Sequence, residues 1–289
     1  MVLETNVLVV NRLQQTDNDV DSLRSFDAAE TEIAIPTVTV QDHVREMLVD
    51  LRDATSAPAA EAAMKVLEKF IDIIDSDKER EKARLILDLN GVSTIVVALW
   101  KWQTSQDFCV FALATLCDLV YLEEETKKVI AEIGGVDTIL MAINKHTLTA
   151  SSTNTFASII NKENSRTKVS KKSKELSKSR LANELPLKSN AVGLLGSLSF
   201  SDVSRHVVAS EECMDFVLET MKLYPNHSHM QKWGCIFVFQ VSKDMEVKNL
   251  LVQRNVITRL ASIIDTFRGR DGGEVVIEKA KPALRVFVE

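Results

Sequence analysis

A recurring spacing of small and apolar residues is the feature that most restricts what this chain can fold into. In five places a small residue is followed by apolar residues four and seven positions later, and such residues share one face of a helix. The five sets are Ala63-Leu67-Phe70, Ala112-Leu116-Leu119, Ala191-Leu195-Leu198, Gly234-Val238-Val241 and Ala280-Leu284-Phe287. Five amphipathic helices of this kind need other helices to cover their apolar faces.

A second apolar anchor precedes four of these sets and gives the repeat its period. Val92 and Val136 are 44 residues apart, and Met214 and Val256 are 42 residues apart. The set that begins at Ala191 starts 55 residues after Val136, whereas the same distance is 20 residues after Val92 and after Met214. The spacing therefore predicts helical repeats, one of which carries about 35 extra residues between positions 147 and 188.

The small residue that begins each set has a physical role. Alanine or glycine lets the backbones of neighbouring helices approach closely, and the two apolar residues then fill the shared core. A unit of two or three helices cannot bury its apolar face alone, so it stacks on its neighbours. The composition agrees with an all-α fold, because 9 glycines and 5 prolines are few for a β or α/β chain of 289 residues.

Composition and charge argue against several classes of protein. The net charge of −6 disfavours a nucleic-acid-binding protein that works by bulk charge. Four cysteines are too few for a disulfide scaffold. No run approaches about 18 apolar residues, and the first ten residues lack the pattern of a secretory signal. We expect a reduced protein of the cytoplasm without a transmembrane segment.

The chain divides into an acidic tail and a repeat domain. Residues 1–38 carry six acids between positions 17 and 32 but only two arginines, and they show no helical period. They are predicted to form a disordered tail. From Val40 onward apolar residues follow the helical period, so the repeat domain is predicted to span 39–289.

The insertion at 147–188 differs in composition from the rest of the chain. It has nine lysines and arginines against three acids, a local charge of +6, which leaves −12 on the remaining chain. A segment this rich in serine and lysine is typical of a disordered loop. Its basic residues include Lys171, Lys172, Lys174, Lys178 and Arg180, and its candidate phosphorylation sites are Ser170, Ser173, Ser177 and Ser179.

Three interpretations of this insertion stay open. It is a solvated spacer, or it contains a short nuclear-import signal at Lys171-Lys172-Ser173-Lys174, or it docks on an acidic face of the same repeat domain and inhibits it. Each phosphate would add about −1.5 to −2 charges and would cancel the basic run.

Residues 91–145 resemble armadillo repeats. The stretches GVSTIVVALWKW, CVFALATLCDLV and KKVIAEIGGVDTILMAI follow that family's order of helices and include its Gly-Gly hinge. Residues 209–264 resemble a more divergent copy. The resemblance implies a right-handed α-solenoid of about five armadillo-like repeats, interrupted by the disordered insertion.

The resemblance also implies where a partner binds. In armadillo proteins the long third helix of each repeat lines a groove, often with an asparagine just before the +7 position that bonds the backbone of an extended peptide. This chain has Lys69, Asp118, Ser197 and Gln240 at that position, so its groove would have a chemistry of its own.

The three tryptophans receive different predictions. Trp100 continues an apolar face and Trp233 adjoins a small residue, so both are expected in the core. Trp102 lies two positions beyond Trp100 and is expected to be more exposed, as a candidate binding residue.

Motifs for catalysis or metal binding are scarce. His227 and His229 have no cysteine or acid at ligand spacing, and Cys109 and Cys117 are expected in the core. No Gly-x-Gly-x-x-Gly, Walker, Gly-x-Ser-x-Gly or His-Glu-x-x-His motif occurs. We expect no enzymatic activity, no metal, no cofactor and no small-molecule substrate.

The sequence therefore predicts a scaffold or adaptor that binds a protein partner along the groove. The alternative is a regulated nuclear-transport or nuclear factor, in which the basic insertion supplies targeting or autoinhibition.

Overall fold

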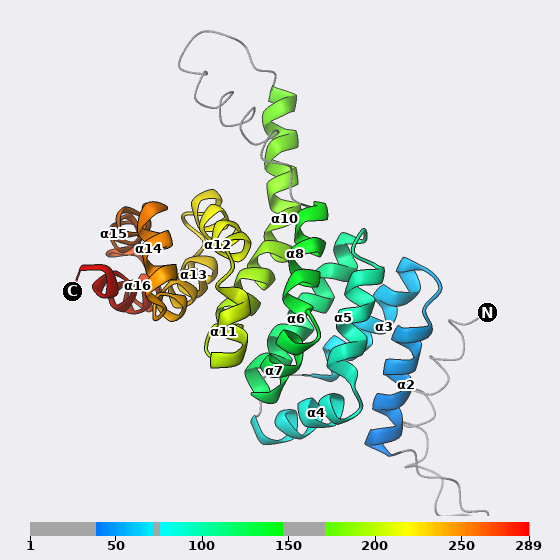
Figure 1. Ribbon diagram of the computed structural model, residues 1–289. Helices are drawn as coiled ribbons and strands as arrows, with labels where there is room; N and C mark the ends of the chain where they lie inside the picture. Colours follow the sequence, from blue (N-terminus) through cyan, green and yellow to red (C-terminus); the bar gives the residue numbers. More distant parts are fainter. Residues whose placement is uncertain (1–38, 72–75, 147–170, 289) are drawn as a thin grey trace, which may run out of the picture. The chain divides into compact units, whose positions relative to one another are not determined.

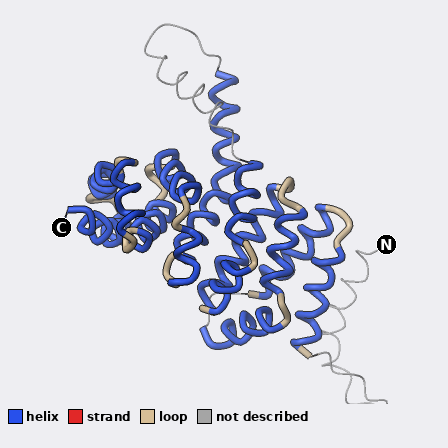
Figure 2. Tube along the Cα trace, viewed as in Figure 1, coloured by secondary structure: helices blue, strands red, loops and turns tan. Residues whose placement is uncertain are grey.

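The computed structural model describes residues 39–71, 76–146 and 171–288, without the side chains of residues 76 and 171–183. The described residues form fourteen helices and no strand (Figure 2). They belong to one compact unit, Thr39–Glu289. No described helix is by itself long and apolar enough to cross a membrane, and one bent pair, Asp77–Asp88 with Gly91–Lys101, passes that test only when taken together. The predicted all-α class is confirmed.

Five helices carry the small-residue pattern, and each of them packs against the next (Figure 1). We call them the core row. They are α3 (Ala57–Phe70), α6 (Gln106–Leu122), α10 (Lys171–Leu198), α13 (Ser228–Val241) and α16 (Gly273–Val288). Because contacts run in order from α3 to α16, helices far apart in the sequence become neighbours in the fold.

Nine further helices surround the core row. Five of them carry the second apolar anchors or the corresponding apolar face: α2 (Val40–Asp53), α5 (Gly91–Lys101), α8 (Gly135–His146), α12 (Glu211–Leu223) and α15 (Val256–Phe267). Four shorter or more polar ones connect them: α4 (Ser76–Asp88), α7 (Glu125–Glu132), α11 (Asp202–Val208) and α14 (Met245–Gln253). Of the anchor helices, α2 packs on α5 and α5 packs on α8.

The buried residues of the core row confirm the predicted pattern. On α6 and α10 the small residue and both of its apolar partners are completely buried. On the two terminal helices of the row the pattern is only partly covered, since Ala63, Phe70, Leu284 and Phe287 are half-buried. The difference has a simple cause, because α3 and α16 each have a core-row neighbour on one side only.

Close approach of backbones explains why small residues occur in the row. A Cβ atom added to Gly196 would lie 3.0 Å from both the ring and the carbonyl oxygen of Trp233. One added to Gly234 would overlap the sulfur of Met221 on α12. Glycine therefore sets the distance between α10 and α13 and between α12 and α13.

Sharp turns lead into three anchor helices and α16. The residue before each of these helices adopts the left-handed conformation, at Asn90, Gly134, Asn255 and Gly272. Glycine and asparagine tolerate this conformation better than other residues. Gly91, which follows Asn90, must also lack a side chain, because a Cβ atom at this position would lie 2.7 Å from the carbonyl oxygen of Ile86.

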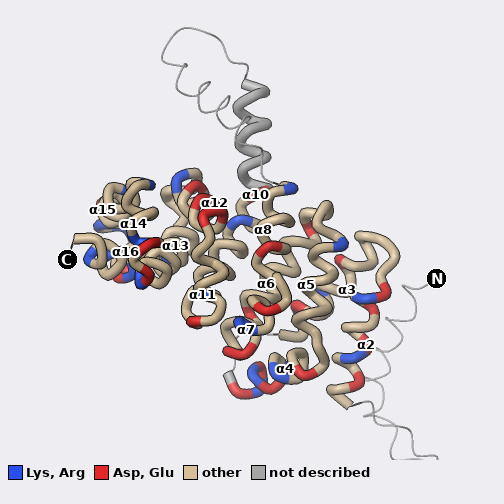
Figure 3. Tube along the Cα trace, viewed as in Figure 1, with Lys and Arg blue, Asp and Glu red and all other residues tan. Residues whose placement is uncertain are grey.

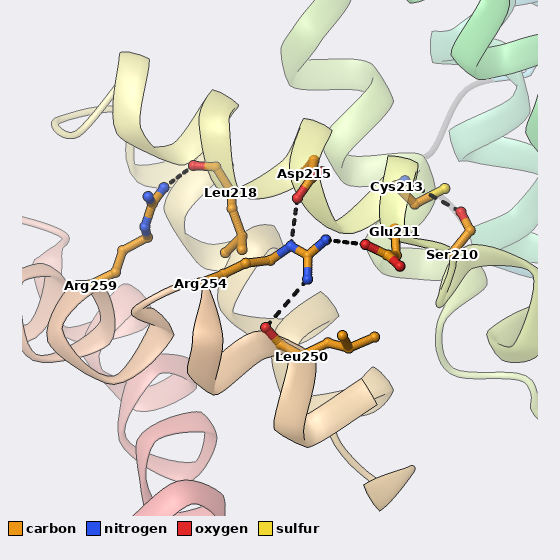
Figure 4. Close-up of polar contacts among 8 residues, drawn as sticks. All are labelled: Ser210, Glu211, Cys213, Asp215, Leu218, Leu250, Arg254 and Arg259. Carbon is orange, nitrogen blue, oxygen red and sulfur yellow. Dashed lines mark hydrogen bonds and ion pairs between the residues drawn. The ribbon is translucent and has the colours of Figure 1, made fainter. Parts of the chain in front are cut away.

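An arginine ties the last turn of α14 to α12 (Figure 4). Arg254 Nε donates to Asp215 Oδ1 at 2.6 Å, and Nη2 donates to Glu211 Oε2 at 2.7 Å. Nearby, Arg259 of α15 donates to the carbonyl oxygen of Leu218, which is also on α12. These contacts fix the rotation of α14 and α15 relative to the preceding anchor helix.

The structure corrects the predicted end of the insertion. Helix α10 already begins at Lys171, and Glu184, Leu187 and Lys188 are buried within the fold. Lys188 Nζ lies 2.8 Å from Glu184 Oε2, so the two buried charges neutralise each other. Pro186 lies inside the helix with its side chain exposed. Residues 171–188 are thus helical and not a loop, and residues 147–170 and the tail at 1–38 lie outside the described residues.

We expect Leu116→Asp to abolish the cooperative thermal unfolding of the chain. Leu116 is completely buried in the middle of the core row. An unpaired buried carboxylate costs about 3–5 kcal/mol, a large part of the stability of a typical domain. Circular dichroism melting measures the effect.

The control is Tyr121→Asp on the same helix. The Tyr121 side chain is 71% exposed, so its replacement changes the free energy of unfolding by at most about 1 kcal/mol. A Leu116→Asp protein that melts like the wild type would mean that the repeat register is wrong.

Candidate functional site

The structure places the four predicted groove residues at the same position on four successive helices of the core row. Lys69 is on α3, Asp118 on α6, Ser197 on α10 and Gln240 on α13, and we call this set the polar strip. Lys69 is exposed and Asp118 is half-buried, whereas Ser197 and Gln240 are buried. The strip therefore becomes less accessible from α3 toward α13.

Two carboxylates meet where α3 and α6 pack together. Burial raises the pKa of Asp118 to about 7, and the negative charge of Glu68 on α3 adds to that increase. Burial also raises the pKa of Glu68, while Lys65 and Lys69 oppose the increase. Neither carboxylate forms a hydrogen bond or a close ion pair with another described residue. This part of the strip can therefore accept a positive charge.

Gln240 contributes an acceptor that is not satisfied within the described part of the chain. Its side chain is 7% exposed, and its Oε1 atom has no hydrogen-bond partner among the described residues. Leaving a buried acceptor without a partner costs about 1–3 kcal/mol. An N–H donor from a bound chain would remove that cost.

Polar contacts join α6, α10 and α13 near the start of the packed part of α10. Asn190 Nδ2 donates to the carbonyl oxygen of Val110 at 3.1 Å, and Cys117 Sγ donates to the carbonyl oxygen of Asn190 at 3.2 Å. Ser189 Oγ lies 3.0 Å from His229 Nδ1. These groups already have partners within the fold, so they hold the three helices in register.

Exposed aromatic residues extend the polar strip toward the ends of α6 and α10. Tyr121 follows Asp118 by three residues on α6, so the two lie on the same side of that helix, and Tyr121 is 71% exposed. Phe200 lies two residues after the end of α10 and is 48% exposed, so the helical period does not place it beside Ser197. Aromatic residues next to polar groups are common in protein–protein interfaces.

The predicted exposures of Trp100 and Trp102 are wrong, because Trp100 is the more exposed of the two. Trp100 is exposed, because it lies three residues after the exposed Val97 on α5. Trp102 follows the end of that helix as its C-cap, so the helical period no longer sets the direction of its side chain. It is half-buried beside Cys109 in the first turn of α6. Trp102 is therefore at the other end of α6 from Asp118 and is not part of the strip.

The basic residues of the insertion fall on the first half of α10. The backbone there is helical from Lys171 onward, which includes Lys172, Lys174, Lys178 and Arg180 together with Ser173, Ser177 and Ser179. Their side chains are not described, and Ser170 lies outside the described residues.

The cysteines and histidines of the described residues have structural surroundings. Burial raises the pKa of Cys109 to about 12 and that of Cys213 to about 11, so these thiols stay protonated at neutral pH. His227 Nδ1 accepts the backbone N–H of Met230 and caps α13. No group of three or more metal-binding side chains occurs in the part of the chain that the structure describes.

Comparisons with known proteins bear on the fold alone. No protein-family model matches the chain, and no curated protein matches it significantly. The chain is similar to a crystal structure of an engineered protein from the Northeast Structural Genomics Consortium, with 14% identity, a TM-score of 0.50 and coverage of 85% of this chain and 96% of that one. A second engineered protein from the same consortium gives 11% identity, a TM-score of 0.48 and coverage of 84% and 98%.

Three residues of the site were missed from the sequence. Glu68 lies close enough to the strip to act on Asp118 because of how α3 packs against α6, and a pattern within one helix does not contain that information. Asn190 directly precedes the small residue Ala191, but no other set has an amide at this position, so the repeat pattern gave no signal for it. Tyr121 lies among apolar residues at the end of α6, so composition suggests burial. Its exposure follows only from how α6 is rotated relative to its neighbours.

We expect Asp118→Asn to stabilise the protein above neutral pH. Because the pKa of Asp118 is raised in the folded state, the folded protein holds this proton more tightly than the unfolded chain does, and stability falls as pH rises from about 4 to 7. The asparagine variant should exceed the wild type by about 2 kcal/mol at pH 8 after allowance for solvent screening, and by progressively less toward pH 4. Thermal or urea unfolding at several pH values measures this difference.

A second variant checks the cause. Glu68→Gln removes the neighbouring charge and should move the midpoint of this pH dependence to lower pH. A constant difference between Asp118→Asn and the wild type from pH 4 to 8 would contradict the assignment.

Proposed function

We propose that this chain is an armadillo-like solenoid of about five repeats that binds a protein partner along the core row. In this proposal it is a non-enzymatic cytoplasmic scaffold, and the polar strip with its neighbouring carboxylate Glu68 makes the main contacts. The observation that carries the proposal is a pair of under-satisfied groups at the strip position: within the described residues Asp118 has no cationic partner and has Glu68 as a negative neighbour, and the buried Gln240 Oε1 has no donor.

The chemistry of these groups indicates an extended partner chain with a positive charge. The Gln240 Oε1 atom is buried in the free protein, so its side chain would have to turn outward to accept a backbone N–H of that chain, as the corresponding asparagine does in armadillo proteins. A lysine or arginine of the partner near Asp118 and Glu68 would lower the pKa of both carboxylates. Tyr121 and Phe200 supply exposed apolar area at the end of the strip.

The nuclear alternative stays a prediction. It depends on the basic insertion, of which residues 147–170 lie outside the described residues and residues 171–183 are described without side chains.

Affinity capture with mass spectrometry tests the scaffold proposal. We expect Asp118→Lys to reduce recovery of a specific partner at least about tenfold, because a second positive charge would face the partner's own. The matched control is Glu219→Lys, the same kind of charge change on the exposed side of α12. A partner that both variants recover equally well would contradict binding along the strip.

The role of the insertion needs a deletion that leaves the fold intact. A deletion of 147–170 keeps Glu184, Leu187 and Lys188, which are buried in α10. Tighter partner binding by this deletion would support autoinhibition, and loss of the partner would make the insertion itself the recognition element.

A further inference from the structure

An apolar stripe crosses the exposed side of α2, α5 and α8, away from the polar strip. Val49 on α2, Val97 on α5 and Met141 on α8 occupy equivalent positions of their helices. Each directly follows a buried residue, and all three are exposed. Trp100, one turn after Val97, is 59% exposed, and Val97 itself is 62% exposed. Because α2 packs on α5 and α5 on α8, these residues form one row, which we call the outer stripe.

The outer stripe is confined to these three helices. The position on α12 that corresponds to Met141 follows the buried Leu218 and is occupied by the exposed Glu219. Large exposed apolar side chains in a continuous row are uncommon on monomeric proteins and mark surfaces that another molecule covers. Trp100 in particular offers the large, rigid contact area typical of interface hot spots.

Charges at the two edges of the stripe have opposite signs. On α8, Asp137 lies four residues before Met141 and Lys145 lies four residues after it, so acid, apolar residue and base share one side of the helix. Figure 3 shows acidic and basic residues interspersed over the described helices. On α5 the corresponding positions around Val97 are Ser93 and Lys101. On α8 the edge at the helix N-terminus is therefore negative and the edge at the C-terminus is positive, whereas the same positions of α2 carry Arg45 and Asp53 in the reverse order.

The corresponding charges of α2 are neutralised within the chain. Arg45 lies 3.1 Å from Asp42, and Arg52 lies 2.8 Å from Asp53. The polarity of the stripe thus depends on α8, where the exposed Asp137 and Lys145 form no ion pair with another described residue, because Lys101 of α5 already donates to the carbonyl oxygen of Ala54 at 2.8 Å.

We propose that the outer stripe binds the same stripe of a second copy of this chain. The two-fold axis would run across the helices, so that each helix lies antiparallel to its equivalent in the partner subunit. Met141 would then meet its own equivalent, and Asp137 would lie opposite Lys145 of the partner subunit. Such a contact is isologous, since one self-complementary surface supplies both sides.

The charge pattern selects this arrangement over the parallel one. With a two-fold axis along the helices, α5 would lie parallel to α5 of the partner, and Lys101 would face its own equivalent. Like charges placed opposite each other in an interface suppress that pairing. The antiparallel arrangement brings opposite charges together at both edges.

The size of the stripe fits a weak dimer. Three neighbouring helices of 11–14 residues, at about 1.5 Å per residue and about 8–10 Å between axes, present a face of roughly 25 Å by 18 Å. With its rim this face approaches the lower end of the range for specific protein interfaces, about 600–800 Å² per partner. We therefore expect a dissociation constant on the order of micromolar.

Sedimentation velocity of the full chain tests the proposal. The wild type should pass from monomer to dimer between about 1 and 200 µM, as mass action requires. Trp100→Glu should weaken dimerisation at least about tenfold, because a charge would be buried in the apolar stripe. The matched control is Tyr121→Glu, since Tyr121 is an even more exposed aromatic residue (71%) on α6, and this variant should dimerise like the wild type.

Two charge reversals test the antiparallel arrangement directly. Asp137→Lys and Lys145→Asp should each dimerise at least about fivefold more weakly alone, since each places like charges opposite one another. An equal mixture of the two variants should recover the wild-type affinity, because opposite charges then meet at both edges. Circular dichroism verifies that each variant is folded.

Three results would overturn the proposal. The first is a wild type that stays monomeric at about 200 µM, and the second is a dimer that Tyr121→Glu disrupts and Trp100→Glu does not. The third is a mixture of the charge variants that associates no better than either variant alone. The first two would exclude this surface, and the third would exclude this orientation.

Discussion

The rest of the structure depends on one constraint: each helix of the core row must bury its apolar face, here called the seam, against the neighbouring helices. On α6, α10 and α13 the residues four and seven positions after the small residue are buried against neighbouring helices, which no helix can achieve alone, and on the terminal helices α3 and α16 they are covered only in part. Leu116 on α6 and Leu195 on α10 are buried in this way, and their packing stabilises the helices more than helix propensity does. The seam fixes the rotation of each helix, and the rotation decides which other residues reach the surface.

The seam could be predicted from the sequence because its spacing is local and recurs. Features outside that period could not. Trp102 follows the end of α5, so a capping conformation replaces the helical period there, whereas Trp100 was assigned to the wrong face of the helix, since it shares a face with the exposed Val97. The end of the insertion was misplaced because charge and serine content, averaged over 147–188, conceal Leu187 and the Glu184–Lys188 pair, which anchor α10 in the core.

The candidate site shows the same division. The positions of Asp118 and Gln240 follow from the spacing, because both lie directly before a +7 residue. Their surroundings do not follow from it. The proximity of Glu68 to Asp118 depends on the stagger of α3 against α6, and the burial of Gln240 depends on how closely α13 is packed. Such relations between helices arise from side-chain volumes across an interface, which a pattern within one helix does not contain.

The polar strip therefore carries groups that lower the stability of the free protein. The raised pKa of Asp118 means that its ionised form is poorly solvated at neutral pH, and the unsatisfied Gln240 acceptor adds a further cost. Apolar residues of similar size would fit a helix seam of this kind at least as well. A bound chain that donates a positive charge and an N–H group would recover the lost free energy, so the same groups that weaken the free protein would stabilise a complex. This difference between the free and bound states is the physical link between the fold and the proposed scaffold function.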